Sequence, residues 1–301
     1  SVDVRGSYAE TKRKSPFELS FEYARTNVAA DPYGQVFVNR LNGNAGDATI
    51  SFSDLHERLW SGGVDVSYKV MDDLTATVGY AYSDTRRTSS RRDFQFQAPS
   101  TFPGGLDMFR PDYLLSPAVV TNFGVVMIET NEGNPAFLAT LKNHAGYVKL
   151  DGRLMENLKF DIGARYETAE EIVAPIQVFT TPGASLAGTN LDNNYVLPAA
   201  TLTWEFQPNM QVRLNASKTL ARPQFRELIY QFYFDPDSDR MYRGNPLLVD
   251  SELTNAEARY EWYYAPQQEI SAAVFYKNIK HPIEAFVSGD QTTSFANAPE
   301  A

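Results

Sequence analysis

The stretch GGVDVSYKVMDDLTATVGYAYSD (Gly62–Asp84) has the pattern of two strands joined by a short turn. Apolar side chains occupy every second position on either side of Met71-Asp72-Asp73: Val64, Val66, Tyr68 and Val70 before it, and Leu74, Ala76, Val78, Tyr80 and Tyr82 after it. A period of two places them on one face of an extended chain, while Asp65, Lys69 and Thr75 fall on the other face. The stretch therefore predicts an antiparallel hairpin with one apolar and one polar face.

The same pattern recurs along the chain. Further hairpins are predicted over residues 144–171 around Met155-Glu156-Asn157, 199–218 around Gln207-Pro208-Asn209, 256–278 around Ala265-Pro266-Gln267-Gln268, and 2–23 around the TKRKS segment, Thr11 to Ser15. Long connections rich in Gly, Pro, Asp, Asn and aromatic residues separate them, at 85–117, 173–194 and 230–252. Five hairpins supply about ten strands, and loops longer than about 15 residues are usually functional.

Tight turns at one end of the strands and long loops at the other are typical of a bacterial outer-membrane barrel. Aromatic side chains near the strand ends fit interfacial girdles: Tyr68, Tyr80, Tyr82, Tyr166, Trp204, Tyr260, Trp262 and Tyr264. We therefore expect an all-β chain, an antiparallel transmembrane β-barrel segment with short periplasmic turns and long extracellular loops. The alternative is a soluble β-rich binding or adhesin module whose apolar faces point inward.

Composition excludes several functions. The chain has 37 acidic and 27 basic side chains and a net charge of −10, which argues against a nucleic-acid partner. It contains no cysteine, so disulfides, thiolate metal sites and cysteine nucleophiles are excluded. His56, His144 and His281 lack a carboxylate or histidine at ligand spacing, so we expect no metal site at them. The sequence has no GxSxG elbow and no Gly-rich phosphate loop, so we expect neither an enzyme nor a cofactor.

Three segments in order carry a family resemblance: VRLNASKTLARPQFREL (Val212–Leu228), RGNPLL (Arg243–Leu248) and NAEARYEWYYAPQQEISAAVFYKNIKHPIE (Asn255–Glu284). Together they resemble the C-terminal barrel half of TonB-dependent outer-membrane receptors of the Caulobacter and Xanthomonas type. The residues that match the family motif are Lys218, Thr219, Arg222, Pro223, Asn245 and Pro246. Leu247 stands where the family commonly has Asp, and Val249-Asp250 replaces the usual Lys-Pro.

The resemblance implies that residues 1–301 are an internal part of a 22-strand barrel, without the plug domain and the TonB box. It also implies a function: active uptake of a scarce nutrient through a plugged barrel, energised by the TonB complex. The implied ligand is a small molecule or an oligosaccharide, such as a ferric siderophore, cobalamin or haem. The implied location is the outer membrane of a Gram-negative cell, in contact with its lipid and lipopolysaccharide.

Candidate ligand-binding residues lie in the long connections. Aromatic side chains there suit stacking on sugar rings or on siderophore aromatics: Phe102, Phe109, Tyr113, Phe232, Tyr233, Phe234 and Tyr242. Their polar neighbours would supply hydrogen bonds: Arg110, Asp112, Asp237 and Arg240. Asp235, Asp237 and Asp239 form either a hard-cation loop or a solvated acidic loop. RRTSSRR (Arg86–Arg92) is either a site for anions such as lipopolysaccharide phosphates or a solvated loop stem.

The stretch ASKTLARPQFREL (Ala216–Leu228) predicts where a strand leaves the membrane. Ala216 ends an apolar series, and Lys218 and Arg222 would lie above the apolar band, where their charges reach water or lipid head groups. Pro223 has no N–H for a central ladder, so strand pairing is expected to weaken there.

Overall fold

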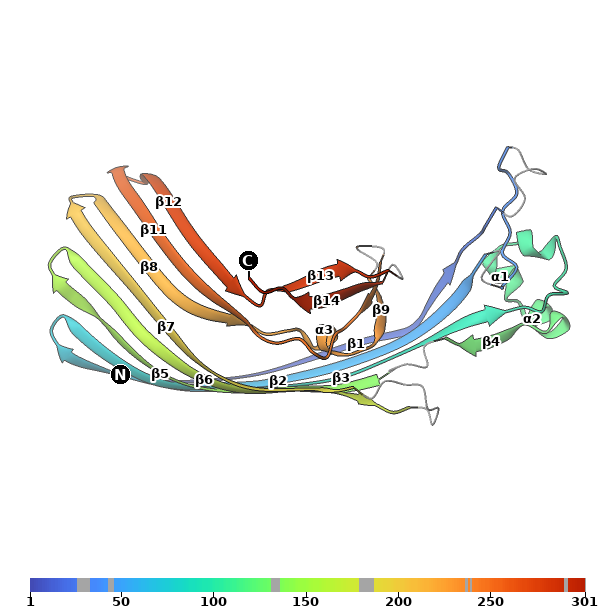
Figure 1. Cartoon of the computed structure of the whole chain (residues 1–301), viewed down its shortest axis with the longest axis horizontal. Coiled ribbons are helices and arrows are strands. Elements are labelled where there is room, and N and C mark those ends of the chain that lie inside the picture. The colour runs from blue at the N-terminus through green and yellow to red at the C-terminus, as the bar shows by residue number, and fades with distance from the viewer. Residues whose placement is uncertain are drawn as a thin grey trace.

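The computed structural model describes residues 1–25, 33–42, 46–130, 136–178, 187–235, 238, 240–289 and 292–300, with the side chains of Phe234 and Asp235 left out. Its main feature is a ten-stranded antiparallel sheet in the order β1-β2-β3-β5-β6-β7-β8-β11-β12, with β4 paired to β3 (Figure 1). The bounds are β1 Val2–Phe21, β2 Ala48–Met71, β3 Leu74–Gln97, β4 Val126–Glu129, β5 Ala136–Met155, β6 Leu158–Ile176, β7 Thr189–Gln207, β8 Met210–Ala221, β11 Ser251–Ala265 and β12 Gln268–Lys280. This all-β, antiparallel architecture confirms the predicted fold class.

A second, four-stranded sheet has the order β13-β14-β10-β9. Its strands are β9 Phe232–Asp235, β10 Arg240–Arg243, β13 Ile283–Val287 and β14 Thr293–Asn297. The helical elements are η1 Leu106–Met108, α1 Pro111–Leu114, α2 Pro117–Phe123 and α3 Phe225–Leu228. No helix in the described ranges is both long and apolar enough to cross a membrane.

Four of the five predicted hairpins are confirmed. β2 and β3, β5 and β6, β7 and β8, and β11 and β12 are each paired across a tight turn. The fifth prediction is wrong, because residues 2–21 form the single strand β1. Between the pairs Ser15–Ser53 and Glu18–Ser51, two residues of β1 lie opposite one residue of β2, so a β-bulge lies there instead of a turn. The extra residue also brings the odd-numbered Leu19 onto the face of the even-numbered Val2.

The register places apolar side chains on one face across the whole sheet. One row of direct cross-strand partners runs through Val2, Val66, Val78, Val148, Ala164 and Pro198. A second row runs through Ala76, Leu150, Ile162, Ala200, Ala216, Ala256 and Tyr276. This face is exposed to the surroundings, with Val2 68%, Val148 55% and Val274 76% accessible.

The opposite face lines the concave side of the sheet. Figure 1 shows an open trough with α3, β13 and β14 on the side toward which the sheet curves. Phe225 and Leu228 of α3 pack there against Phe137, Ala139 and Val173, which are odd-numbered residues of β5 and β6. Odd-numbered positions of these strands therefore point inward, and the exposed apolar face is the convex, outward one.

The strands run further than the sequence predicted. β3 continues to Gln97 and includes Arg86–Arg92, which was expected to lie in a long loop. β6 extends to Ile176 and β7 begins at Thr189, so part of the 173–194 connection is strand as well. The ends of the segment 98–125 pack against residues near the start of β2. Ala98 and Val125 are buried there together with Leu41 and Ala48, in a small second core. Polar strand extensions beyond the apolar rows account for the misassigned loops.

Candidate functional site

Polar side chains connect neighbouring strands along the inner face. Arg5 of β1 forms an ion pair with Asp65 of β2, and Tyr147 of β5 donates a hydrogen bond to the same carboxylate. Lys149 and Asp161 form a second pair at 2.8 Å. The inner face is therefore hydrophilic at the level where the outer face is apolar. This division of faces is the one expected of a membrane barrel wall.

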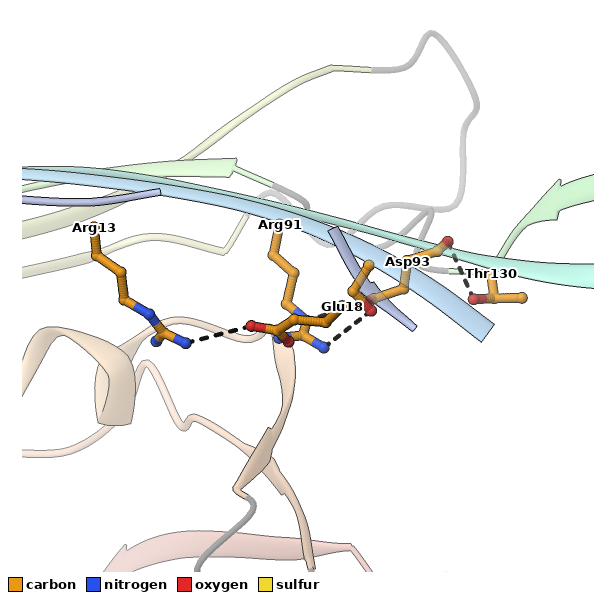
Figure 2. Close-up of polar contacts among 6 residues, drawn as sticks. Arg13, Glu18, Arg91, Asp93 and Thr130 are labelled. Carbon is orange, nitrogen blue, oxygen red and sulfur yellow. Dashed lines mark hydrogen bonds and ion pairs between the residues drawn. The ribbon is translucent and has the colours of Figure 1, made fainter. Parts of the chain in front are cut away.

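A larger polar cluster lies near the outer ends of β1, β2 and β3, by which we mean the ends that lie away from the tight turns. Figure 2 shows Arg13 and Arg91 converging on Glu18, with contacts of 3.5 and 3.8 Å. Arg91 also pairs with Asp93 at 2.9 Å, and the Thr130 hydroxyl donates to the Asp93 carbonyl at 3.2 Å. These contacts join the bulged part of β1 to β3.

The family motif folds back into the concave side after its strand ends. Pairing between β8 and β11 stops at Ala221, two residues before Pro223, as the missing N–H predicts. The chain then forms α3, whose capping box joins Gln224 and Glu227. Residues of the motif form a buried core with the inner wall: Phe225, Leu228, Ile229 and Leu248 with Phe137, Ala139, Val173 and Phe295. The motif thus anchors the connection between β8 and β11, which we call the lumenal segment, to the inner face of the sheet.

The RGNPLL segment completes this anchor. A side chain at Gly244 would come within 2.8 Å of the carbonyl oxygens of Arg226 and Glu227, so only glycine fits. Asn245 donates to the Phe295 carbonyl at 2.9 Å, and the Thr189 hydroxyl donates to the Pro246 carbonyl at 2.9 Å. The motif residues Asn245 and Pro246 therefore hold chain segments together, which makes their role structural.

Two motif cations have different environments. Lys218 is half-exposed on the outward face and pairs with Glu252, as expected for a residue above the apolar band. The next residue of β8, Thr219, lies on the opposite face and accepts a hydrogen bond from Asn255 at 3.2 Å. The prediction for Arg222 is wrong, because its side chain is 15% exposed and pairs at 2.5 Å with Glu167, which is 7% exposed. Since β8 has ended, Arg222 no longer follows the strand alternation and turns into the concave side.

An aromatic stack lies on the second sheet. Tyr242 is stacked between Tyr233 and Phe295, with ring centroids 5.4 and 5.9 Å apart. The Arg226 guanidinium lies 5.8 Å from the Tyr233 ring. Arg240 is exposed at the start of β10. Of the other predicted residues here, the Phe234 side chain and Asp237 lie outside the described residues, as does Asp239.

The other predicted ligand-binding residues form a separate group. Arg110 and Asp112 pair at 3.2 Å, with side chains 85% and 70% exposed. Phe109 and Tyr113 have ring centroids 4.7 Å apart, and the Tyr23 hydroxyl donates to the Phe109 carbonyl at 2.6 Å. None of the described contacts joins this group to the Tyr242 stack. The candidate ligand-binding residues therefore form two clusters.

The arginines of RRTSSRR alternate between the two faces because they lie in a strand. Arg87 points inward, where it pairs with Glu57 at 2.6 Å and lies 5.2 Å from the Phe225 ring. Arg91 is the inward member of the polar cluster in Figure 2. Arg92 points outward and pairs with Glu129 at 2.7 Å, whereas Arg86 is exposed on the outward face. Two of the four arginines of the predicted anion site therefore point inward and form ion pairs there.

The histidines have partners that the sequence did not predict. His56 contacts Glu10 of the adjacent strand at 2.6 Å, and His144 contacts the Tyr80 hydroxyl at 2.7 Å. Both are thus engaged in cross-strand contacts on the outward face. Within the described ranges, no group of three or more His, Cys, Asp or Glu side chains is arranged to hold a metal ion.

The sequence also missed a buried polar group below the motif. Glu167, Glu171 and Asp250 are each at most 6% exposed, and Tyr195 donates to Asp250 at 3.0 Å. Glu167 and Glu171 in GARYETAEE and Tyr195 in DNNY follow the alternation of inward strand residues, whereas Asp250 precedes β11. That alternation predicts an inward face, but it does not predict that a returning segment buries it.

A family model described as TonB dependent receptor-like, beta-barrel, matches residues 3–301. No curated protein sequence matches the chain. Among solved structures, the chain is similar to the ferric-catecholate import receptor Fiu from Escherichia coli K12, with 12% identity and a TM-score of 0.52. The match covers 99% of this chain and 41% of Fiu.

Two further structures share the fold. The ferric citrate transporter FecA matches with 12% identity and a TM-score of 0.50, over 93% of this chain and 32% of FecA. The copper transporter OprC matches with 11% identity and a TM-score of 0.52, over 84% of this chain and 37% of OprC. The chain thus spans less than half of the length of each of these structures.

Proposed function

Because the chain belongs to the TonB-dependent receptor-like β-barrel family, we propose that it forms part of the wall of an outer-membrane receptor that takes up a scarce nutrient. In this proposal the barrel surrounds a plug, and the TonB complex supplies the energy for transport. The chain corresponds to 41% of the length of Fiu, so the plug and the TonB-contacting segment are assigned to the rest of the receptor.

The observation that carries the proposal is the division of the sheet into an outward apolar face and an inward polar face. Val2, Val66 and Val148 belong to one continuous apolar row on the convex side. Contact with lipid tails would stabilise such an exposed apolar row, whereas contact with water would be unfavourable. The soluble adhesin alternative requires apolar faces that point inward. The concave side of the described sheet carries Arg5, Asp65 and Lys149, which favours the membrane wall.

For the ligand, we propose a ferric siderophore or an oligosaccharide. Of the similar structures, Fiu is a ferric-catecholate import receptor and FecA is a ferric citrate transporter. The stacked Tyr242 with Tyr233 and the exposed Tyr113 with Arg110 supply aromatic and cationic groups that suit either class. Both groups lie in the long connections, at the end of the strands away from the tight turns. In this proposal, ligand enters at that end.

For the lipid environment, we propose that the outward face above the apolar rows contacts lipopolysaccharide. Tyr8 and Trp60 pack together there, with ring centroids 4.5 Å apart, as expected at an interface. Lys14 and Arg86, both exposed, lie beyond them on the outward face of β1 and β3. Phosphate groups of an anionic glycolipid would be attracted to these cations.

The membrane assignment is tested by detergent dependence. The receptor that contains this chain is extracted in detergent and then transferred to plain buffer, and its size and folding are measured by light scattering and circular dichroism. Aggregation on detergent removal is expected. A receptor that remains monomeric and folded without detergent would contradict the membrane wall.

Transport is tested by uptake in cells that express the receptor. A ferric catecholate, ferric citrate and a maltodextrin are offered as radiolabelled probes, with and without a functional TonB protein. Uptake of one iron complex or of the sugar that requires TonB supports the proposal. Equal uptake in both cell types argues against energised transport.

A further inference from the structure

A cluster of oxygen-bearing side chains surrounds Ala169 on the inner wall. Ala169 of β6 has Asn143 of β5 and Asn193 of β7 as its direct cross-strand partners. Glu167 and Glu171 lie two residues away on the same face of β6, because the period of a strand is two. We call these residues, with Asp250, which covers them, the Ala169 cluster.

Asp250 brings the lumenal segment onto this cluster. It lies immediately before β11 and accepts hydrogen bonds from Asn193 at 3.2 Å and Tyr195 at 3.0 Å, both to the same carboxylate oxygen. Arg222 approaches from the end of β8 and pairs with Glu167. The cluster is thus closed by two segments that return from the outer end of the sheet.

Three buried oxygen atoms of the cluster have no hydrogen-bond partner among the described residues. They are Glu171 Oε2, Asp250 Oδ1 and Asn143 Oδ1. Glu171 is 2% exposed and Asp250 is 5% exposed. Each of these atoms is an acceptor, and an unsatisfied buried acceptor is unfavourable because it has lost its hydrogen bonds to water. A hydrogen-bond donor or a cation would satisfy these acceptors.

The charges favour a cation over a single donor. Glu167 forms ion pairs with Arg165 and Arg222, whereas Glu171 and Asp250 form none within the described part of the chain. If both are ionised, two negative charges remain without compensation. A proton would neutralise one of them, whereas a divalent cation would neutralise both and contact several oxygens at once.

Glu171 lies outside the membrane-spanning part of β6. The outward face of this strand is apolar up to Tyr166 and then carries Thr168 and Glu170. Burial and the nearby Asp250 raise the pKa of Glu171 to about 8.

We propose that the Ala169 cluster binds one hard divalent cation of the Ca²⁺ type. Glu171 and Asp250 supply the carboxylate ligands, and the Asn143 amide oxygen and water complete the shell, since Ca²⁺ accepts six to eight oxygens in flexible geometry. Neither Glu171 nor Asp250 has an ion-pair partner among the described residues, whereas Glu167 is held by Arg165 and Arg222. Asn143 and Arg165 also line an open pocket of about 280 Å³ on the inner face.

The cation would lock the lumenal segment to the barrel wall. Glu171 belongs to β6, whereas Asp250 ends the connection that carries α3, β9 and β10. A bridge between them would stabilise this connection without contacting ligand. The inference goes beyond the proposed transport function and does not depend on which nutrient is carried.

The test is Ca²⁺ titration of the detergent-solubilised receptor, freed of lipopolysaccharide and treated with chelator. Calorimetry is expected to show one saturable site assigned to the cluster, and Ca²⁺ is expected to raise Tm. Glu171→Gln and Asp250→Asn should remove that site. Glu170→Gln is the matched control, because Glu170 is the next residue of β6 but points outward, and it should retain the site.

Each outcome decides the proposal. Loss of the site in both cluster variants, with retention in Glu170→Gln, supports it, provided that the variants unfold at a similar Tm to the wild type in chelator. A wild-type receptor whose Tm does not respond to Ca²⁺ overturns it, as does a site that survives both substitutions. A Tm that changes only with pH near 8, and only when Glu171 is present, would assign a proton to the cluster instead and would also overturn it.

Discussion

Tyr147 of β5 donates its hydroxyl hydrogen bond to Asp65 of β2, across the intervening strand β3. Asp65, Gly79 and Tyr147 are direct partners in register, so the tyrosine ring lies over Gly79. A methyl group on Gly79 would overlap both the ring and the carboxylate. The absence of a side chain on β3 therefore allows β2 and β5 to be joined on the inner face.

Gly79→Ala is expected to destabilise the barrel by about 1 to 3 kcal/mol, because the Tyr147 ring must move from its place. The free energy of unfolding is measured by urea titration in detergent. Gly146→Ala is the matched control, since a methyl group there meets no atom within 4 Å. The close packing would be contradicted by equal losses in the two variants.

Arg222→Met is expected to cost about 3 to 5 kcal/mol, because it leaves Glu167 as a buried charge that has lost one of its two guanidinium partners. Lys218→Met is the control in the same segment. Lys218 is 37% exposed and its pair with Glu252 is worth about 0 to 1 kcal/mol. Both values come from the same unfolding titration. A larger loss for Lys218→Met than for Arg222→Met would show that the inward pair does not hold the motif.

The sequence predicted the sheet well because alternation with a period of two is a local property. The strands around Asp72-Asp73 and Glu156-Asn157 follow it up to a register shift beside each turn. β1 was misassigned because its apolar positions change from even to odd numbers, which a turn and a bulge explain equally well. Only the register with β2, a contact distant in sequence, distinguishes them.

The role of the family motif was harder to predict for a related reason. Pro223 correctly predicted the end of pairing, since its missing N–H acts locally. The burial of Arg222 and Phe225 depends on residues of β5 and β6 that are distant in sequence, such as Glu167, which lies 55 residues before Arg222. Alternation gives the face of a strand residue, but it does not apply once the chain has left the strand.

Leu228→Ala tests whether the motif anchors the lumenal segment. Leu228 is 1% exposed and packs within the core that joins α3 to the inner wall. Its truncation is expected to cost about 2 to 5 kcal/mol through lost burial and a cavity. Leu247→Ala removes the same atoms from a side chain that is 84% exposed and should change stability by less than about 0.5 kcal/mol. Protease susceptibility near α3 should rise only in the first variant, and equal behaviour of the two would contradict the anchor.

The outward cations provide a test of the lipopolysaccharide contact. Lys14 and Arg13 are neighbours in β1, but Lys14 points outward, whereas Arg13 points inward to Glu18. Lys14→Gln is expected to weaken binding by about 1 kcal/mol, or about fivefold, because one cation near the phosphates is lost. Arg13→Gln should leave binding unchanged. Binding of purified lipopolysaccharide to the receptor in neutral detergent is measured at low and high salt, and the Lys14 effect should shrink as salt screens it. If Arg13→Gln weakens binding as much as Lys14→Gln, the proposed contact between the phosphates and the outward face of β1 is contradicted.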